Sequence, residues 1–204
     1  AIELAHETLT GAAFERILVA ALQALTRTDP KAAGALVNTM TPGDAQTQAA
    51  LAVARALAAQ NPGDALAWAR TLAVGDTQRL AVNNVLEIWA AKDPVAAGQY
   101  VVRMNAGPEQ ETAAGHLARL LAANPAGAIA WAQSFTSEPS RQAALVNLAS
   151  AWAQRDPAAA ARWAGSLASP DVRTPALHGA LSYWVMQDSG AARNFIFGLT
   201  GETQ

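Results

Sequence analysis

Apolar side chains recur along this chain at the spacing of one helix face, and the whole pattern repeats roughly every 32 residues. In each period an alanine is followed after three positions by a large apolar residue and after about seven by another. These offsets return to the same side of an α-helix. The alanines are Ala33, Ala65, Ala97, Ala128, Ala160 and Ala192. The large residues are Leu36, Trp68, Tyr100, Trp131, Trp163 and Phe195, followed by Met40, Leu72, Met104, Phe135, Leu167 and Leu199.

A capping dipeptide stands before each of these apolar faces. The copies are Asp29-Pro30, Asn61-Pro62, Asp93-Pro94, Asn124-Pro125, Asp156-Pro157 and the degenerate Asp188-Ser189, at steps of 32, 32, 31, 32 and 32 residues. The side-chain oxygen of Asp or Asn can accept a hydrogen bond from the free amides of a first helical turn, and Pro loses nothing at the next position. Each dipeptide therefore predicts the start of a helix, the A helix, of about eleven residues.

A second helix, the B helix, is predicted in each period after a cluster of Gly, Pro, Ser or Asp, and it runs for about sixteen residues to the next cap. A large apolar residue stands four positions before each cap: Leu25, Leu57, Trp89, Leu120, Trp152 and Trp184. All six tryptophans thus occupy one of two repeat positions. Such regularity predicts packing between neighbouring helices rather than a ligand-stacking platform.

These elements predict an all-α fold, a right-handed α-solenoid of about six and a half helical hairpins, because one hairpin cannot bury both of its faces. The prediction is a single repeat domain over residues 1–204, with repeats beginning near 29, 61, 93, 124, 156 and 188. Residues 1–28 form a partial repeat in which Ala1 and Leu4 keep the register. We expect a piece of a longer array, or a unit that associates through its ends. Roughly a quarter of the residues are alanine, which favours helix.

Composition excludes several classes of function. Charged residues make up 15% of the chain and the net charge is −2, which does not favour binding to a phosphate backbone. No apolar run is long enough to span a membrane. The chain has no cysteine, which excludes disulfides and favours an exported or periplasmic protein over a cytosolic one.

The start of each repeat resembles that of tetratricopeptide repeats, as Asp93-Pro94, Ala97 and Tyr100 show. The resemblance implies a binding groove for peptides or proteins, lined by the A helices. The period of 32 rather than 34 and the short A helix depart from that family. The positions four and eight after each Pro, which we expect to point outward, are Gly34 and Asn38, Leu66 and Arg70, Gly98 and Val102, Ile129 and Gln133, Ala161 and Gly165, Arg193 and Phe197. This small, apolar row excludes the family's carboxylate clamp and indicates either a tightly curved inner face or an apolar groove for an amphipathic segment.

Polar residues on or beside the A helices are the candidate partner-binding residues: Asn38, Arg70, Gln99, Arg103, Gln133, Arg162 and Arg193. Four of them, Arg70, Arg103, Arg162 and Arg193, occupy different repeat offsets. They form no single basic row, so we expect a protein or peptide partner and no nucleic acid.

No catalytic, cofactor-binding or metal-binding residue is predicted. The histidines His6, His116 and His178 show no metal-ligand spacing. Most acids are interpreted as helix caps: Asp29, Asp44, Asp76, Asp93, Asp156, Asp171 and Asp188. Glu87, Glu109, Glu111 and Glu138 remain. We predict a binding or scaffolding module. The alternatives are an accessory domain of a larger enzyme, for example one acting on a cell-wall polymer, and a toroidal α/α hydrolase with paired carboxylates.

Overall fold

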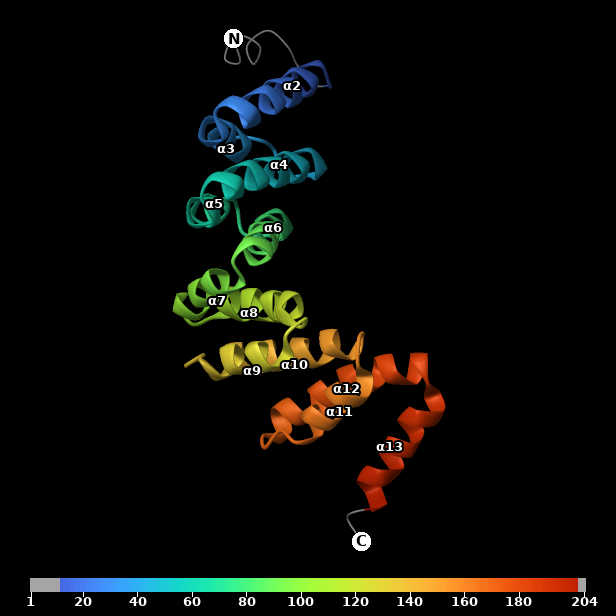
Figure 1. Ribbon diagram of the computed structural model, residues 1–204. Helices are drawn as coiled ribbons and strands as arrows, with labels where there is room; N and C mark the ends of the chain where they lie inside the picture. Colours follow the sequence, from blue (N-terminus) through green and yellow to red (C-terminus); the bar gives the residue numbers. More distant parts are fainter. Residues whose placement is uncertain (1–11, 202–204) are drawn as a thin grey trace. The chain divides into compact units, whose positions relative to one another are not determined.

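The computed structural model describes residues 12–201, which are all-α and contain no strand (Figure 1). Ala1, Leu4, His6 and the rest of residues 1–11 lie outside the described part. The chain divides into two compact units, Ala1–Lys92 and Asp93–Gln204.

Each unit is a series of consecutive helices. The first contains α2 (Ala12–Thr28), α3 (Pro30–Asn38), α4 (Asp44–Gln60), α5 (Pro62–Ala69) and α6 (Asp76–Lys92). The second contains α7 (Pro94–Arg103), α8 (Pro108–Leu121), α9 (Pro125–Gln133), α10 (Glu138–Ala153), α11 (Pro157–Gly165), α12 (Pro170–Gln187) and α13 (Ser189–Gly201). The odd-numbered helices are the predicted A helices and the even-numbered ones the B helices.

All six predicted N-caps of the A helices are confirmed. The Oδ1 atom of Asp29 accepts from the backbone N–H of Ala32 at 3.0 Å, and the same bond recurs at Asp93, at Asp156 and, without proline, at Asp188. Asn61 and Asn124 cap α5 and α9 in the same way. One carboxylate or amide per repeat therefore sets where each A helix begins.

The A helices that are followed by a B helix, α3 to α11, are shorter than expected, with eight to ten residues instead of eleven. Their last turns tighten into i to i+3 hydrogen bonds, such as Thr39 N–H to Leu36 O at 3.0 Å and Ser134 N–H to Trp131 O at 3.0 Å. The large apolar residue ten positions after the Pro consequently lies beyond the helix, where Phe135 is still buried.

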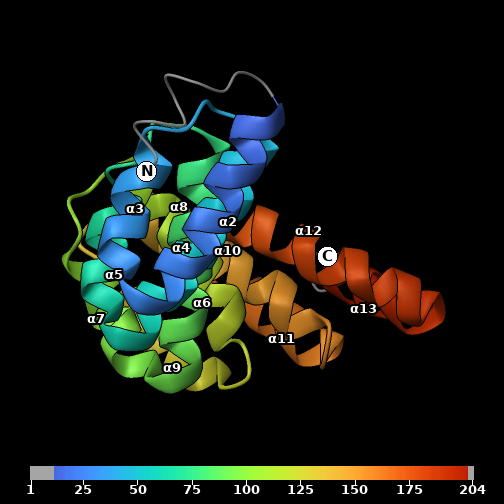
Figure 2. The ribbon, with the colours of Figure 1, turned by 90° about the horizontal axis from the view of Figure 1, so that it is seen from above.

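Contacts inside each unit connect near neighbours along the chain. In the second unit, α10 packs against α8, α9, α11 and α12, and α12 packs against α10, α11 and α13. In the first, α4 packs against α2, α3, α5 and α6. The B helices of a unit thus lie side by side, with the A helices filling in beside them (Figures 1 and 2).

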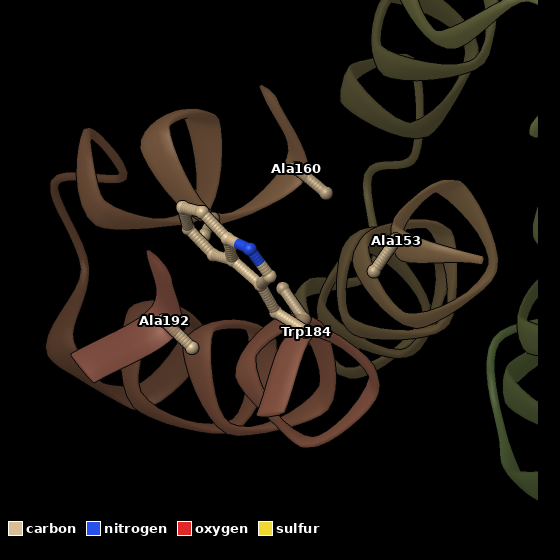
Figure 3. Packing of buried hydrophobic residues seen from close by; sticks show 6 residues of the cluster. Ala153, Ala160, Trp184 and Ala192 are labelled. Carbon is tan, nitrogen blue, oxygen red and sulfur yellow. The ribbon is translucent and has the colours of Figure 1, made fainter. Parts of the chain in front are cut away.

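The core combines many small side chains, most of them alanine, with larger aliphatic and aromatic ones. All six repeat alanines are buried, as predicted. Figure 3 shows the arrangement at the end of the second unit, where Trp184 of α12 lies among Ala153, Ala160 and Ala192. Small residues let helix axes approach closely, and the indole fills the remaining space.

The two tryptophan positions meet across successive helices. Trp152 of α10 contacts Trp163 of α11 with ring centroids 5.8 Å apart, and Trp184 of α12 contacts Phe195 of α13 at 5.2 Å. These rings are packing elements between neighbouring helices, as their regular spacing predicts.

Candidate functional site: an apolar cleft between α7 and α9

A cleft of about 340 Å³ lies inside the second unit, between two successive A helices. The first two turns of α7 and of α9 form its two sides, and the end of α8 closes it. Its lining residues are Pro94, Val95, Gln99, Leu121, Asn124, Gly127, Ala128 and Trp131.

The wall contributed by Trp131 is fixed by two contacts. The indole Nε1–H donates to the backbone carbonyl of Gly98 at 3.0 Å, and the ring meets Phe135 edge-on with centroids 5.1 Å apart. A Cβ atom on Gly98 would lie 2.9 Å from the indole Cδ1 and Nε1, so only glycine leaves room for this approach. The side chain is therefore held in place before any ligand binds, which lowers the entropic cost of binding.

The glycine–tryptophan contact corrects one prediction. Gly34 and Trp68 form the same pair in the first unit, where a Cβ atom on Gly34 would lie 2.5 Å from the indole Nε1. The position four after the Pro is therefore not an outward row. Four of its six members are buried, Ile129 is half-buried and Arg193 is exposed; the buried members are Gly34, Leu66, Gly98 and Ala161. Where glycine stands there, it receives the tryptophan of the next A helix.

The cleft is apolar with polar groups at its edge. None of the lining residues carries a charge. Asn124 already uses Oδ1 to cap α9, through the N–H of Gly127 at 3.2 Å. Gln99 is exposed, and Val95 is 67% exposed. Chemically, the cleft can accept an apolar group against Trp131, with the amide of Gln99 available to a polar neighbour of that group.

Of the candidate partner-binding residues, Gln99 alone lines the cleft. Asn38 donates from Nδ2 to Thr71 Oγ1 at 2.9 Å and so joins two repeats of the first unit. Arg70 follows α5, and its carbonyl accepts from Gln78 at 3.2 Å. The remaining candidates are exposed on four different A helices: Arg103, Gln133, Arg162 and Arg193.

A repeated polar position was missed by the sequence analysis. Near the start of five B helices, a long side chain reaches back and donates to backbone carbonyls at the end of the preceding A helix or in the connection just after it. Gln110 is 3% exposed and donates to the carbonyls of Val101, Val102 and Met104, each at 3.1 Å. We call these residues the carbonyl-binding row: Gln46, Gln78, Gln110, Arg141 and Arg173.

The row could have been found from its spacing, since its steps of 32, 32, 31 and 32 residues match those of the caps. The row is hard to recognise in the sequence because its residue type changes from glutamine to arginine after Gln110. Both side chains donate N–H groups, so either can satisfy the carbonyls that a helix end leaves free.

Three acids are not the caps that the sequence analysis expected. Asp44, Asp76 and Asp171 lie within the first turns of α4, α6 and α12, and glycine or serine precedes them at the boundary. There they interact with the positive end of the helix. Asp76 also pairs with Arg79 at 2.8 Å.

No group of three or more metal-binding side chains occurs among residues 12–201. The histidines in this part of the chain, His116 and His178, lie on separate B helices, α8 and α12. Among the same residues, no helix is both long and apolar enough to cross a membrane.

The fold and the cleft define a class, an all-α protein of packed helical hairpins. No protein-family model, curated protein or solved structure matches this chain. The resemblance to tetratricopeptide repeats therefore stays a prediction.

Proposed function

We propose that this chain is a peptide- or protein-binding module, an α-solenoid of about six and a half hairpins with no catalytic role of its own. The observation that carries the proposal is the apolar cleft between α7 and α9, one wall of which is the fixed indole of Trp131. A preformed, mostly apolar concavity with few polar groups is the usual form of a binding site.

The solenoid architecture is supported by contacts inside each unit. In the first unit, α3 and α5 each contact the B helix before them and the B helix after them. In the second unit, α9 and α11 do the same, and α13 contacts α12. The caps continue from one unit to the next, with steps of 32 and 31 residues through Asn61, Asp93 and Asn124. Linear arrays of this kind mainly present surfaces to other macromolecules.

The chemistry of the cleft indicates its ligand. A volume of about 340 Å³ has room for one large apolar side chain with part of its backbone, such as Leu, Phe or Met. The absence of charge from the lining favours a neutral anchor, and Gln99 can hydrogen-bond to the ligand backbone beside it. We therefore propose a peptide segment anchored by one apolar residue.

A displayed peptide library, selected on the 204-residue chain, tests this proposal. Selected peptides should share a large apolar residue. Their affinity should fall at least about tenfold in Val95→Asp, because an apolar anchor would then force desolvation of a carboxylate at the cleft edge. Val95 is mostly exposed, so the substitution should leave the fold intact.

Val74→Asp is the matched control, since Val74 is 95% exposed and lies between α5 and α6, outside the cleft. The proposal is wrong if no peptide is selected, or if Val95→Asp and Val74→Asp bind the selected peptides as tightly as the unmodified chain.

A further inference from the structure

Three exposed side chains of α7 form a stripe that begins at the cleft and continues beyond it. Val95 and Gln99 line the cleft, and Arg103 follows one helical turn further on, at the end of α7. Residues four apart lie on the same side of a helix, so the three side chains are neighbours along its axis. All three are exposed. We call Val95, Gln99 and Arg103 the α7 stripe.

The other repeats show that the first two positions of the α7 stripe are unusual. At the position of Val95, the other A helices have Lys31, Gly63, Ala126, Ala158 and Gly190. At the position of Gln99, they have Ala35, Ala67, Ala130, Arg162 and Asn194. Most repeats therefore carry small side chains on this side of the A helix, whereas α7 carries a branched apolar side chain followed by an amide.

Arg103 also departs from the repeat pattern. Four other A helices have a hydroxyl residue at this position, and each hydroxyl donates to the backbone carbonyl three residues earlier at 2.6 or 2.7 Å: Thr39, Thr71, Ser134 and Ser166. In α7 an arginine replaces the hydroxyl, and its guanidinium makes no hydrogen bond or ion pair with any described residue. Its N–H donors are therefore available to a ligand.

The geometry of α7 sets the spacing that a ligand must match. Because an α-helix rises about 1.5 Å per residue, Arg103 lies about 6 Å beyond Gln99 and about 12 Å beyond Val95 along the axis. An extended peptide advances about 3.3 Å per residue. A peptide that lies along α7 with an apolar side chain in the cleft would thus bring a residue about three or four positions from this anchor to Arg103.

We propose that Arg103 binds an acidic side chain of the peptide that the cleft anchors, about three or four residues from the apolar anchor. A guanidinium pairs with a carboxylate through two parallel hydrogen bonds, which gives the contact a defined geometry. This inference rests on the proposed function, because Arg103 can select among peptides only if the cleft holds their anchor. It adds a charge requirement to a cleft whose lining is uncharged.

The displayed peptide library, selected in parallel on the unmodified chain and on Arg103→Glu, tests this role. Peptides selected on the unmodified chain should carry Asp or Glu about three or four positions from the shared apolar residue. Peptides selected on Arg103→Glu should keep the apolar residue and carry Lys or Arg at that spacing instead.

Arg155→Glu is the matched control. Arg155 is an exposed arginine of the same unit, but it lies between α10 and α11, outside the cleft. This variant should select the same acidic peptides as the unmodified chain. Circular dichroism melting checks that each variant folds, which we expect because both arginines are exposed.

A synthetic peptide from the selection on the unmodified chain measures the ion pair by fluorescence anisotropy. Its amidated C-terminus leaves the side-chain carboxylate as the acidic group, so a chain-end carboxylate cannot supply the contact. Replacing the acid with its neutral amide should weaken binding to the unmodified chain roughly twofold to fivefold at low salt, as for an exposed ion pair. The acid and amide forms should bind Arg103→Gln equally.

The outcomes separate this inference from the proposed function. Selected peptides that share the apolar residue but carry no acid at the expected spacing would overturn the role of Arg103 and leave the apolar anchor supported. Acidic peptides that bind Arg103→Glu as tightly as the unmodified chain would do the same. If no peptide with an apolar residue is selected, peptide binding at the cleft is wrong, and the role of Arg103 is wrong with it.

Discussion

At the scale of single residues, glycine in the A helices has a packing role that opposes its helix propensity. Glycine inside a helix ordinarily costs about 0.5–1 kcal/mol relative to alanine. Gly34 and Gly98 nevertheless stand where a tryptophan ring of the next A helix rests on the backbone. Gly165 is also in an A helix, but an added Cβ atom there would find only Leu177 Cδ2 at 3.9 Å, an ordinary contact distance. The same substitution should therefore have opposite effects at these positions.

Gly98→Ala should destabilise the chain by about 1–2 kcal/mol, because the new methyl group overlaps the indole of Trp131 and weakens its hydrogen bond to the Gly98 carbonyl. Gly165→Ala should stabilise it by up to about 1 kcal/mol. Urea unfolding followed by circular dichroism measures both. Equal shifts of the two midpoints in the same direction would contradict the packing role of Gly98.

At the scale of the helical element, the boundary between A and B helices depends on a side chain that comes from the B helix. Gln110 satisfies three carbonyls at the end of α7, and its Oε1 atom accepts from Ser140 Oγ of α10 at 2.8 Å. Both polar side chains are almost fully buried. One glutamine thus connects three helices, and its loss would leave several buried polar groups without partners.

Gln110→Ala should cost about 2–4 kcal/mol through these unsatisfied groups and the cavity that remains. Gln78→Ala is the control, since Gln78 donates to only two carbonyls, of Arg70 and Leu72, and is half-buried. It should cost about 1 kcal/mol. Thermal melts compare the stability of the two variants. A larger decrease in melting temperature for Gln78→Ala would show that burial of the hydrogen-bond network does not determine its contribution to stability.

At the scale of the whole molecule, the sequence predicts the features that depend on the geometry of a single helix, but not those that depend on how hairpins pack together. Caps such as Asp156 and buried alanines such as Ala160 were predictable because each follows from helix geometry alone. The burial of Gly98 was not, because spacing within one helix does not say which face meets the next hairpin. The cleft was not predicted for the same reason, because its walls come from three different helices, α7, α8 and α9. Gln99 was predicted as a contact residue, but Trp131 was interpreted only as packing.

The contacts between neighbouring helices also predict how far along the chain a destabilising substitution should act. A Cβ atom on Gly179 of α12 would lie 2.1 Å from Ser150 Oγ of α10, so Gly179→Leu should force these two B helices apart at a cost of about 1–3 kcal/mol. Because the helices of each unit pack mainly against near neighbours along the chain, the loss of stability should be local. Hydrogen exchange should then quicken in α10 to α13 and stay unchanged in α2 to α4, while Gly165→Ala should leave protection the same or higher throughout. Uniformly faster exchange from α2 to α13 in Gly179→Leu would show instead that both units unfold as one cooperative structure.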